Sequence, residues 1–358
     1  MTHMTYLEAA VVGLIQGVSE LFPVSSLGHN VLIPALVGGS WARDLNVARP
    51  ESPYLAFIVG LHVATAIALL IYFWRDWVRI IGGFFRSVGH FIRPAPGTDR
   101  WRLESADEKL AWMIILATIP VGLAGLLFEH PFRVLFGHPI AAAAFLVVNG
   151  LILYAGERFR RRASLQADRE VAAARQLAAV GAGAAVPGVD APARAPGETA
   201  GTRAPGAARH AAGHQVERAA EIAQAVEADR RLAREGYAEA VVIGSAQILA
   251  LLAGISRDGV TMVAGMFRGL SREDAARFAF LLATPVILAA GVLKVPDLTG
   301  PLGNGIHGQI LLGSVLSGVG AYLSVRYLVR YFRTRTLTPF AIYCIVFGLG
   351  SIVYLSVR

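Results

Sequence analysis

Residues 8–30 read E-A-A-V-V-G-L-I-Q-G-V-S-E-L-F-P-V-S-S-L-G-H-N, an apolar run that ends in a cluster of polar residues. As a helix, the run from Tyr6 to Val18 spans only about 20 Å at roughly 1.5 Å per residue, which is too short for a hydrocarbon core of roughly 30 Å. A second short apolar run follows from Val31 to Val37. Two half-helices around a polar break predict a re-entrant hairpin, residues 6–37. Its tip would lie at membrane depth, where irregular backbone persists only inside protein or beside water.

The same pattern returns 231 positions later, where residues 239–261 read E-A-V-V-I-G-S-A-Q-I-L-A-L-L-A-G-I-S-R-D-G-V-T. The identical pairs run from the apolar segment through a shared Ser-x-x-Gly tip: Glu8/Glu239, Ala9/Ala240, Val11/Val242, Gly13/Gly244, Gln16/Gln247, Ser25/Ser256 and Gly28/Gly259. Chance similarity of two helices rich in small residues is the alternative, but the register through the tip favours a repeat. Paired interrupted segments in two halves indicate a central binding site.

The composition indicates an all-α polytopic membrane protein. Hydrophobic residues make up 55% of the chain and the mean hydropathy is +0.53. Apolar windows predict six full crossings, near residues 54, 110, 138, 275, 309 and 339. The single cysteine, Cys344, excludes a disulfide framework. The N-terminus has no charged region followed by a cleavage site, so we expect no removable signal peptide.

The predicted domain organisation is two membrane repeats separated by an insertion. The first repeat covers residues 1–156, and the second covers 237–358 with its own re-entrant hairpin at 237–266. The insertion, 157–236, begins with a basic run, and its middle, 180–213, is rich in Ala, Gly and Pro with few aliphatic residues. Such a composition cannot build a core, so we expect a largely disordered cytoplasmic segment. Because the insertion lacks interleaved aromatic residues, we do not expect it to bind nucleic acid.

The distribution of Lys and Arg predicts the orientation in the membrane. Six crossings place the termini and the loops at 38–53, 129–137 and 294–308 on one side. That side holds five basic residues, against fourteen on the other side when the insertion is left out. Cytoplasmic loops carry the excess of Lys and Arg, so the richer side should be cytoplasmic. The first hairpin then enters from outside and the second from the cytoplasm, which describes an inverted-topology repeat.

The two predicted tips together offer the chemistry of a diphosphate site. The first contains Glu20, Ser25, Ser26 and His29, and the second contains Ser256, Arg257 and Thr261. Arg presents a fork of donors suited to phosphate oxygens, hydroxyls and half-helix N-termini add anion ligands, and His is the usual acid or base near neutral pH. The alternative is that Glu20 and Arg257 only neutralise each other inside the membrane. A further histidine, His62, lies within the first crossing, either as a hydrogen-bonded packing group or as a functional one.

Here the sequence resembles the undecaprenyl-diphosphate phosphatase, or bacitracin-resistance, family. The resemblance rests on Q-G-V-S-E-L-F-P-V-S-S-L-G-H at 16–29 and G-I-S-R-D-G-V-T at 254–261, with G-M-F-R-G-L-S-R at 265–272 and P-F-A-I-Y at 339–343. It covers most of both halves but not the insertion. It implies inverted repeats, removal of the terminal phosphate from undecaprenyl diphosphate, and recycling of the lipid carrier for cell-wall synthesis.

The resemblance also implies roles for individual residues. Glu20, Ser26, His29 and Arg257 would be catalytic, and phosphate would be bound by Ser25, Ser256, Arg257 and Thr261. Ser26 is the expected nucleophile with His29 as its base or as the acid for the leaving group, and a water activated by His29 is the alternative. A divalent cation, Mg²⁺ or Ca²⁺, is expected on Glu20, with Gln16 and Asp258 as additional candidate ligands.

Three positions depart from the usual family pattern. Gln16 stands where many members have Glu, Ala253 replaces a usual Pro, and Asp258 replaces a usual Ser. Asp258 could repel phosphate, hold a cation or orient Arg257.

The rival function is a transporter or flippase of a polyprenyl phosphate, which would use the same anion ligands without cleaving a bond. Expected partners are a polyprenyl diphosphate lipid, the bacterial inner-membrane bilayer and, as an alternative to a monomer, a second copy of the chain. The site should open to the outer face.

Overall fold

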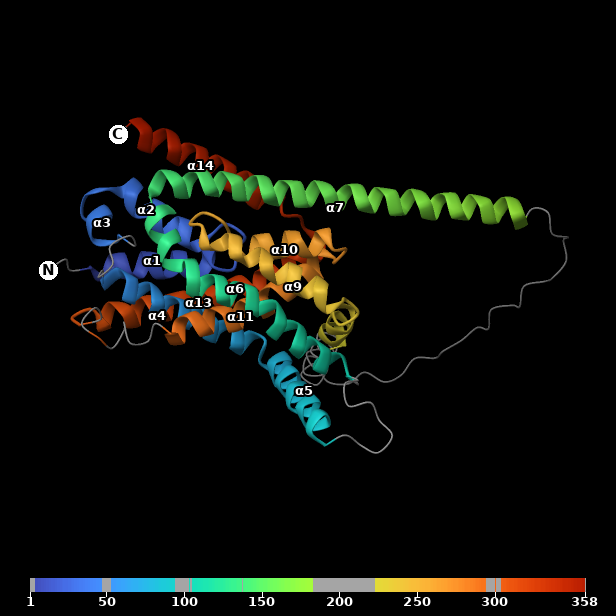
Figure 1. The fold of residues 1–358 in the computed structure, drawn as a ribbon. Helices are drawn as coiled ribbons and strands as arrows, with labels where there is room; N and C mark the ends of the chain where they lie inside the picture. Colours follow the sequence, from blue (N-terminus) through green and yellow to red (C-terminus); the bar gives the residue numbers. More distant parts are fainter. Residues whose placement is uncertain are drawn as a thin grey trace, which may run out of the picture. The chain divides into compact units, whose positions relative to one another are not determined.

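The computed structural model describes residues 4–46, 53–93, 103, 105–136, 138–182, 223–293, 300 and 304–357. These residues are mostly helical, and no strand occurs among them. Figure 1 shows their arrangement. The helices are α1 (Tyr6–Ser19), α2 (Ser26–Val37), α3 (Gly39–Asp44), α4 (Pro53–Tyr72), α5 (Trp74–Ile92), α6 (Ala106–Phe136), α7 (Pro139–Ala182), α9 (Tyr237–Ser245), the 3-10 helix η1 (Ala246–Leu251), α10 (Arg257–Phe267), α11 (Arg272–Leu293), α13 (His307–Thr334) and α14 (Thr338–Val357).

The predicted crossings are present as long apolar helices. Five helices of the described chain, α6, α7, α11, α13 and α14, are long and apolar enough to span a membrane. A sixth candidate is α4 together with α5, which are bent by 84° at Phe73. Helix α5 is amphipathic, with exposed Val78 and Phe85 on one side and buried Asp76 and Ile80 on the other. Since it turns away from α4, α5 has the character of an interfacial helix rather than of a further crossing.

The first hairpin consists of the two short helices α1 and α2, as the polar break predicts. A capping box starts α1: the Thr5 side chain accepts from the Glu8 backbone N–H, and the Glu8 carboxylate accepts from the Thr5 N–H at 2.7 Å. At the tip, the Ser25 hydroxyl caps α2 by accepting from Gly28 N at 3.2 Å. Ser25 has a φ of +67°, a left-handed conformation that costs a non-glycine residue energy and that here turns the chain back into α2.

The second hairpin repeats this design with α9, η1 and α10. The Ser256 hydroxyl caps α10 by accepting from Gly259 N at 3.1 Å, just as Ser25 caps α2 three residues before Gly28. The Ser-x-x-Gly identity between the two tips is therefore an N-cap that starts the returning half-helix. The N-terminal ends of α2 and α10, which carry the positive end of each helix dipole, both begin at these tips.

Each hairpin packs against a long helix from the other half of the chain. Helix α1 lies along α13, as Figure 1 shows, and α9 lies along α6. The approach is closest at small residues: a Cβ placed on Gly13 would lie 2.5 Å from Gly313 O, and one on Gly244 would lie 2.1 Å from Ala117 O. Residues that the repeat makes equivalent, Gly13 and Gly244, thus make equivalent backbone contacts with a helix of the opposite half. Small residues permit this approach in membrane helices.

Replacing Gly17 by Ala should destabilise this packing, because a Cβ at that position would lie 2.3 Å from the Ser317 backbone oxygen. Backbone atoms cannot yield like a flexible side chain, so we expect a loss of about 1–3 kcal/mol, typical of overpacking. The measurement is thermal unfolding in detergent. The control is Gly122→Ala on α6, where nothing lies within 4 Å of the added methyl. Equal stability of the two variants would contradict the close approach of α1 and α13.

The chain divides into two compact units, and the second, Phe159–Ala228, lies within the predicted insertion. Residues 183–222, which include most of the segment predicted to be disordered, lie outside the described residues. In the first unit, buried Asp229 accepts hydrogen bonds from Arg79 at 2.6 Å and Arg277 at 2.8 Å. The chain that returns from the insertion is therefore held at Asp229 by ion pairs with α5 and α11.

Candidate active site

The Glu20 carboxylate is the centre of a buried polar network. It accepts hydrogen bonds from the Gln16 amide at 2.8 Å, from the Ser26 hydroxyl and from Arg257 at 2.8 Å. Ser26 belongs to the same hairpin, whereas Arg257 is the first residue of α10 in the other hairpin. The two tips thus meet at Glu20, as their opposite charges predict. The carboxylate is almost fully buried, so these donors replace the water that would otherwise solvate its charge.

Gln16 and His62 extend the network from Glu20 toward α4. The Gln16 carbonyl accepts from the Asn30 amide at 2.6 Å, which directs its NH₂ group toward Glu20. His62 Nε2 lies 3.3 Å from Gln16 Nε2 and 3.5 Å from Glu20 Oε2. Its Nδ1 lies 2.8 Å from the Ile58 carbonyl oxygen, so the ring is fixed in place. His62 therefore lies next to Glu20, and its position is compatible both with a hydrogen-bonded packing group and with a functional residue.

Arg257 is oriented by two carboxylates. Its NH2 group donates to Glu20, and its Nε lies 3.5 Å from Oδ1 of the adjacent Asp258. Among the described residues, neither Arg257 Nε nor the Asp258 oxygens make a hydrogen bond, and the contact between them is an ion pair. Of the three roles considered for Asp258, this position best matches orientation of the guanidinium. The part of the Arg257 fork that Glu20 does not engage keeps donors for an anion.

The two tips touch directly around Ser25. The Ser25 hydroxyl oxygen accepts from Gly254 N at 3.2 Å, in addition to capping α2. Gly254 has a φ of +110°, and a Cβ on Gly28 would lie 2.9 Å from Gly254 Cα. Glycine at 28 and 254 is thus required by close approach and by backbone conformation. Ser25 has a structural part in the site that the sequence did not indicate.

Asn149 of α7 ties the two tips together. Its amide nitrogen donates to Pro23 O and its amide oxygen accepts from Ser256 N, both at 3.0 Å. The residue is fully buried, so it satisfies backbone groups of both hairpins inside the protein, where water does not reach them. Thr261, predicted to bind phosphate, donates its hydroxyl to the Arg257 carbonyl at 2.7 Å.

His29 lies beside this network but is not bonded to Ser26. Its Nδ1 lies 2.7 Å from Ser25 O, and its Nε2 lies 2.7 Å from the hydroxyl of Tyr343 in α14. The Ser26 hydroxyl donates to Glu20 instead. In this geometry the group placed to take the Ser26 proton is Glu20. Nε2 of His29 faces the Tyr343 hydroxyl instead. Of the two roles expected for His29, base for Ser26 or acid for the leaving group, the first has no direct hydrogen bond to Ser26 behind it, and both stay predictions.

The residues present fit a divalent cation only if the substrate completes its coordination. Within the described part of the chain, no three His, Cys, Asp or Glu side chains come together as metal ligands. Gln16 turns its nitrogen, not its oxygen, toward Glu20. Mg²⁺ typically takes one or two carboxylates and fills the remaining positions with phosphate oxygens and water. Glu20 and Asp258 both form ion pairs with Arg257, and the Asp258 oxygens make no hydrogen bond to the residues that the structure describes, which is compatible with that kind of site.

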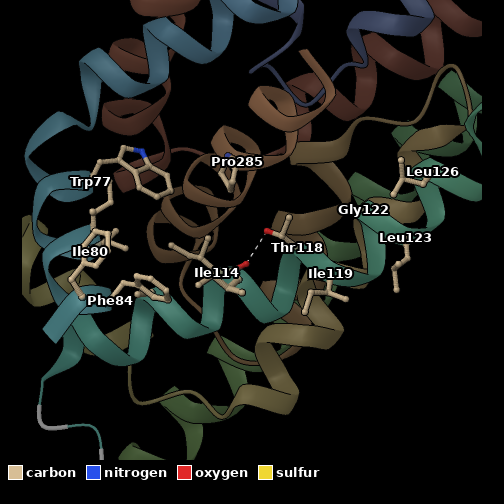
Figure 2. Close-up of a pocket in the computed structure, with 14 residues that line it drawn as sticks. Trp77, Ile80, Phe84, Ile114, Thr118, Ile119, Gly122, Leu123, Leu126 and Pro285 are labelled. Atoms are coloured by element: carbon tan, nitrogen blue, oxygen red, sulfur yellow. Dashed lines mark hydrogen bonds between the residues drawn. The ribbon is translucent and has the colours of Figure 1, made fainter. Parts of the chain in front are cut away.

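A separate pocket, shown in Figure 2, is apolar and contains none of the predicted site residues. Its volume is about 630 Å³, and it lies between α5, α6 and Pro285 of α11. Trp77, Ile80 and Phe84 line one side and Ile114 and Leu123 the other, while the Thr118 hydroxyl is bonded to the Ile114 carbonyl. Such a lining suits hydrocarbon and offers nothing to a diphosphate, so we assign the polar chemistry to the tips.

The comparisons with known proteins agree with the geometry. The family model of bacitracin resistance protein BacA matches residues 9–193 and 207–350. Undecaprenyl-diphosphatase of Mycolicibacterium paratuberculosis is 55% identical over 356 residues, which cover 99% of both chains. Undecaprenyl-diphosphatase 2 of Frankia alni is 53% identical over 97% of both chains, and undecaprenyl-diphosphatase 2 of Chromobacterium violaceum is 35% identical over 98% of this chain and 99% of its own. These alignments cover nearly the whole chain and therefore include the insertion, which the resemblance of the motifs did not cover.

Proposed function

Because the chain belongs to the family of bacitracin resistance protein BacA and is an undecaprenyl-diphosphate phosphatase, we propose that the network around Glu20 is its active site. The enzyme hydrolyses undecaprenyl diphosphate to undecaprenyl phosphate and inorganic phosphate, which recycles the lipid carrier of cell-wall synthesis and is consistent with resistance to bacitracin. One observation supports this assignment most directly. Ser26 of the first hairpin and Arg257 of the second both donate a hydrogen bond to the buried Glu20 carboxylate.

The terminal phosphate would be held at the start of α10. Arg257 supplies the planar fork of donors, and the N-terminal ends of α2 and α10 supply positive dipole ends. The Ser25 and Ser256 hydroxyl oxygens accept the cap hydrogen bonds, so each hydroxyl hydrogen is left to donate to a phosphate oxygen. Thr261 would support Arg257 through its backbone carbonyl. These groups stabilise charge on the equatorial oxygens during in-line attack.

Ser26 is the proposed nucleophile, with Glu20 as the acceptor of its proton. As the Ser26 oxygen bonds to the terminal phosphorus, the bond from phosphorus to the bridging oxygen breaks and undecaprenyl phosphate leaves. The Ser26 proton passes to Glu20, to which the hydroxyl already donates. Water then attacks the phosphoserine phosphorus and gives one proton to Nε2 of His29, while the bond from phosphorus to the Ser26 oxygen breaks. Inorganic phosphate leaves, Ser26 regains the proton held by Glu20, and His29 releases its proton to phosphate or solvent. Direct attack by water is the alternative, and it would form no phosphoserine.

A divalent cation, Mg²⁺ or Ca²⁺, would be held by Glu20 together with the phosphate oxygens of the substrate. Asp258, which forms an ion pair with the same arginine as Glu20, would be a further candidate ligand. When bound, the cation would neutralise the diphosphate charge and polarise the bond that breaks. Gln16 would contribute by holding the Glu20 carboxylate rather than by ligation.

Phosphate release by purified protein in detergent tests the assignment of function. An enzyme releases inorganic phosphate from the lipid diphosphate without any compartment, whereas a flippase needs two sides and cleaves nothing. Release that disappears in Ser26→Ala, while thermal unfolding is unchanged, supports the proposed site. Phosphate release by Ser26→Ala at the rate of the parent protein would still show an enzyme, but it would exclude Ser26 as the nucleophile.

The proposed setting is the bacterial inner membrane, with the first hairpin open to the outer face and an inverted repeat in which each hairpin enters from its own side. The charge excess supports it: the basic side of the chain includes α5, with Arg75, Arg79 and Arg86, and its C-cap residue Arg93. A site open to the outside suits a carrier diphosphate that is released in the outer leaflet once its sugar cargo has been used.

Cysteine labelling tests this orientation. After Cys344→Ser, a single cysteine is introduced at exposed Ser40 in α3 or at Gly89 in α5, where an added Cβ meets nothing within 4 Å. Ser87 is unsuitable, because it is buried and bonded to Trp112. A membrane-impermeant thiol reagent should label Ser40→Cys in intact cells and Gly89→Cys only after lysis. The reverse pattern would invert the topology, and labelling of both in intact cells would contradict the crossing by α4.

A further inference from the structure

Both ring nitrogens of His29 have defined partners. Nδ1 faces the Ser25 carbonyl oxygen, which can only accept a hydrogen bond, so we assign the hydrogen of the neutral ring to Nδ1. The lone pair is then on Nε2, which lies 2.7 Å from the Tyr343 hydroxyl oxygen. Tyr343 must therefore donate its hydroxyl hydrogen to the nitrogen that is available for proton exchange.

The same tyrosine also fixes the plane of the ring. The Tyr343 and His29 rings are parallel within 5°, with centroids 5.7 Å apart. Phe347, one turn later on α14, is parallel to His29 within 11° at 5.3 Å. His29 itself is almost completely buried, whereas Tyr343 is 43% exposed at the edge of the protein. The last crossing helix, 314 residues away in the chain, thus sets the orientation of a histidine in the first hairpin.

We propose that Tyr343 is a positioning residue for catalysis, whose hydroxyl acts together with the Ser25 carbonyl to hold the Nδ1–H form of His29 in one orientation, with Nε2 kept as the nitrogen that exchanges a proton during hydrolysis of the lipid diphosphate. The inference rests on the role proposed for His29. No bond of the tyrosine breaks: its hydrogen stays on the phenol oxygen and leaves the hydrogen bond when His29 takes up or delivers a proton. The hydrogen bond at one ring nitrogen of a histidine sets the protonation of the other, so Ser25 at Nδ1 fixes the tautomer and Tyr343 at Nε2 fixes the orientation of the nitrogen that reacts.

Tyr343→Phe separates this role from packing, because phenylalanine keeps the ring and both stacking contacts and removes only the hydroxyl. We expect kcat for phosphate release to fall about tenfold, the effect of losing one hydrogen bond worth roughly 1.4 kcal/mol, with KM within about twofold. Thermal unfolding in detergent should not change. The matched control is Tyr327→Phe, which loses a hydroxyl from another tyrosine that stacks on the first hairpin, on Phe22 at 6.0 Å. It should retain the parent kcat.

A double-mutant cycle with His29→Gln completes the test, because two groups that act together give non-additive effects. In the His29→Gln background, Tyr343→Phe should change the residual rate by less than about twofold. An unchanged kcat in Tyr343→Phe alone, or the same loss in both backgrounds, would overturn the inference. Parent-like activity of His29→Gln would overturn both the role of His29 and that of Tyr343. Absence of phosphate release by the parent protein would instead count against the proposed function itself.

Discussion

Arg257→Lys is expected to lower kcat/KM for phosphate release at least 100-fold while the protein remains folded. Arg257 shares its fork between Glu20, at 2.8 Å, and the side facing Asp258, where Nε lies 3.5 Å from Oδ1. Lysine can keep one contact with Glu20 and so preserve the buried ion pair. It cannot supply planar donors to two phosphate oxygens at once, and removing one such donor from a charged transition state typically costs roughly 10²–10³ in rate.

The control for this substitution is Arg268→Lys, at the exposed C-terminal end of the same helix. It makes the same chemical change away from the tips and should leave phosphate release near that of the parent protein. Thermal unfolding of both variants in detergent separates loss of catalysis from loss of fold. Parent-like turnover in Arg257→Lys would reduce the requirement at this position to a positive charge and would remove the fork from the mechanism.

The fold could be predicted from the sequence to the extent that it follows from hydropathy. Long apolar windows specify the crossing helices, and a short run that stops at Ser19 and Glu20 cannot cross, whatever it packs against. The pairing of Glu20 with Arg257 could also be predicted, because neither charge is tolerated in a membrane alone. The local structure of the tips could also be predicted, because Ser25 and Ser256 lie where an N-cap must start a helix.

The rest of the site depends on how crossing helices are rotated against the tips, which no local pattern encodes. Asn149 and Tyr343 are polar groups in otherwise apolar helices, and only packing turns them toward Pro23 and His29. The sequence offered a weak signal for each, since a polar side chain within a membrane helix faces the protein interior or a polar partner. His62, a polar residue in the apolar helix α4, gave the same weak signal. The Ser26 hydroxyl donates to Glu20 and not to His29, because proximity in sequence does not decide which acceptor a hydroxyl faces. The role of His29 as an acid or a base stays a prediction.

Glu20→Gln should have the largest effect of any single substitution in the site. The amide keeps the size of the carboxylate but cannot take the Ser26 proton, hold a cation or balance the charge of Arg257. Loss of a general base alone costs roughly 10²–10⁴ in rate, so we expect at least a 1000-fold fall in kcat. The measurement is phosphate release together with thermal unfolding.

The matched control is Glu8→Gln in the same helix α1, where the buried carboxylate accepts from the Thr5 backbone at 2.7 Å. Glutamine also serves at this position of a capping box, so Glu8→Gln should retain both fold and activity. Glu20→Gln could also unfold the protein by leaving buried Arg257 without a counter-charge. Glu20→Asp, which keeps the charge but shortens the side chain, distinguishes that case: it should fold and still lose most activity, because the carboxylate no longer reaches Ser26 and Arg257 together. Substantial phosphate release by folded Glu20→Gln would show that another group accepts the proton and would remove Glu20 from the centre of the mechanism.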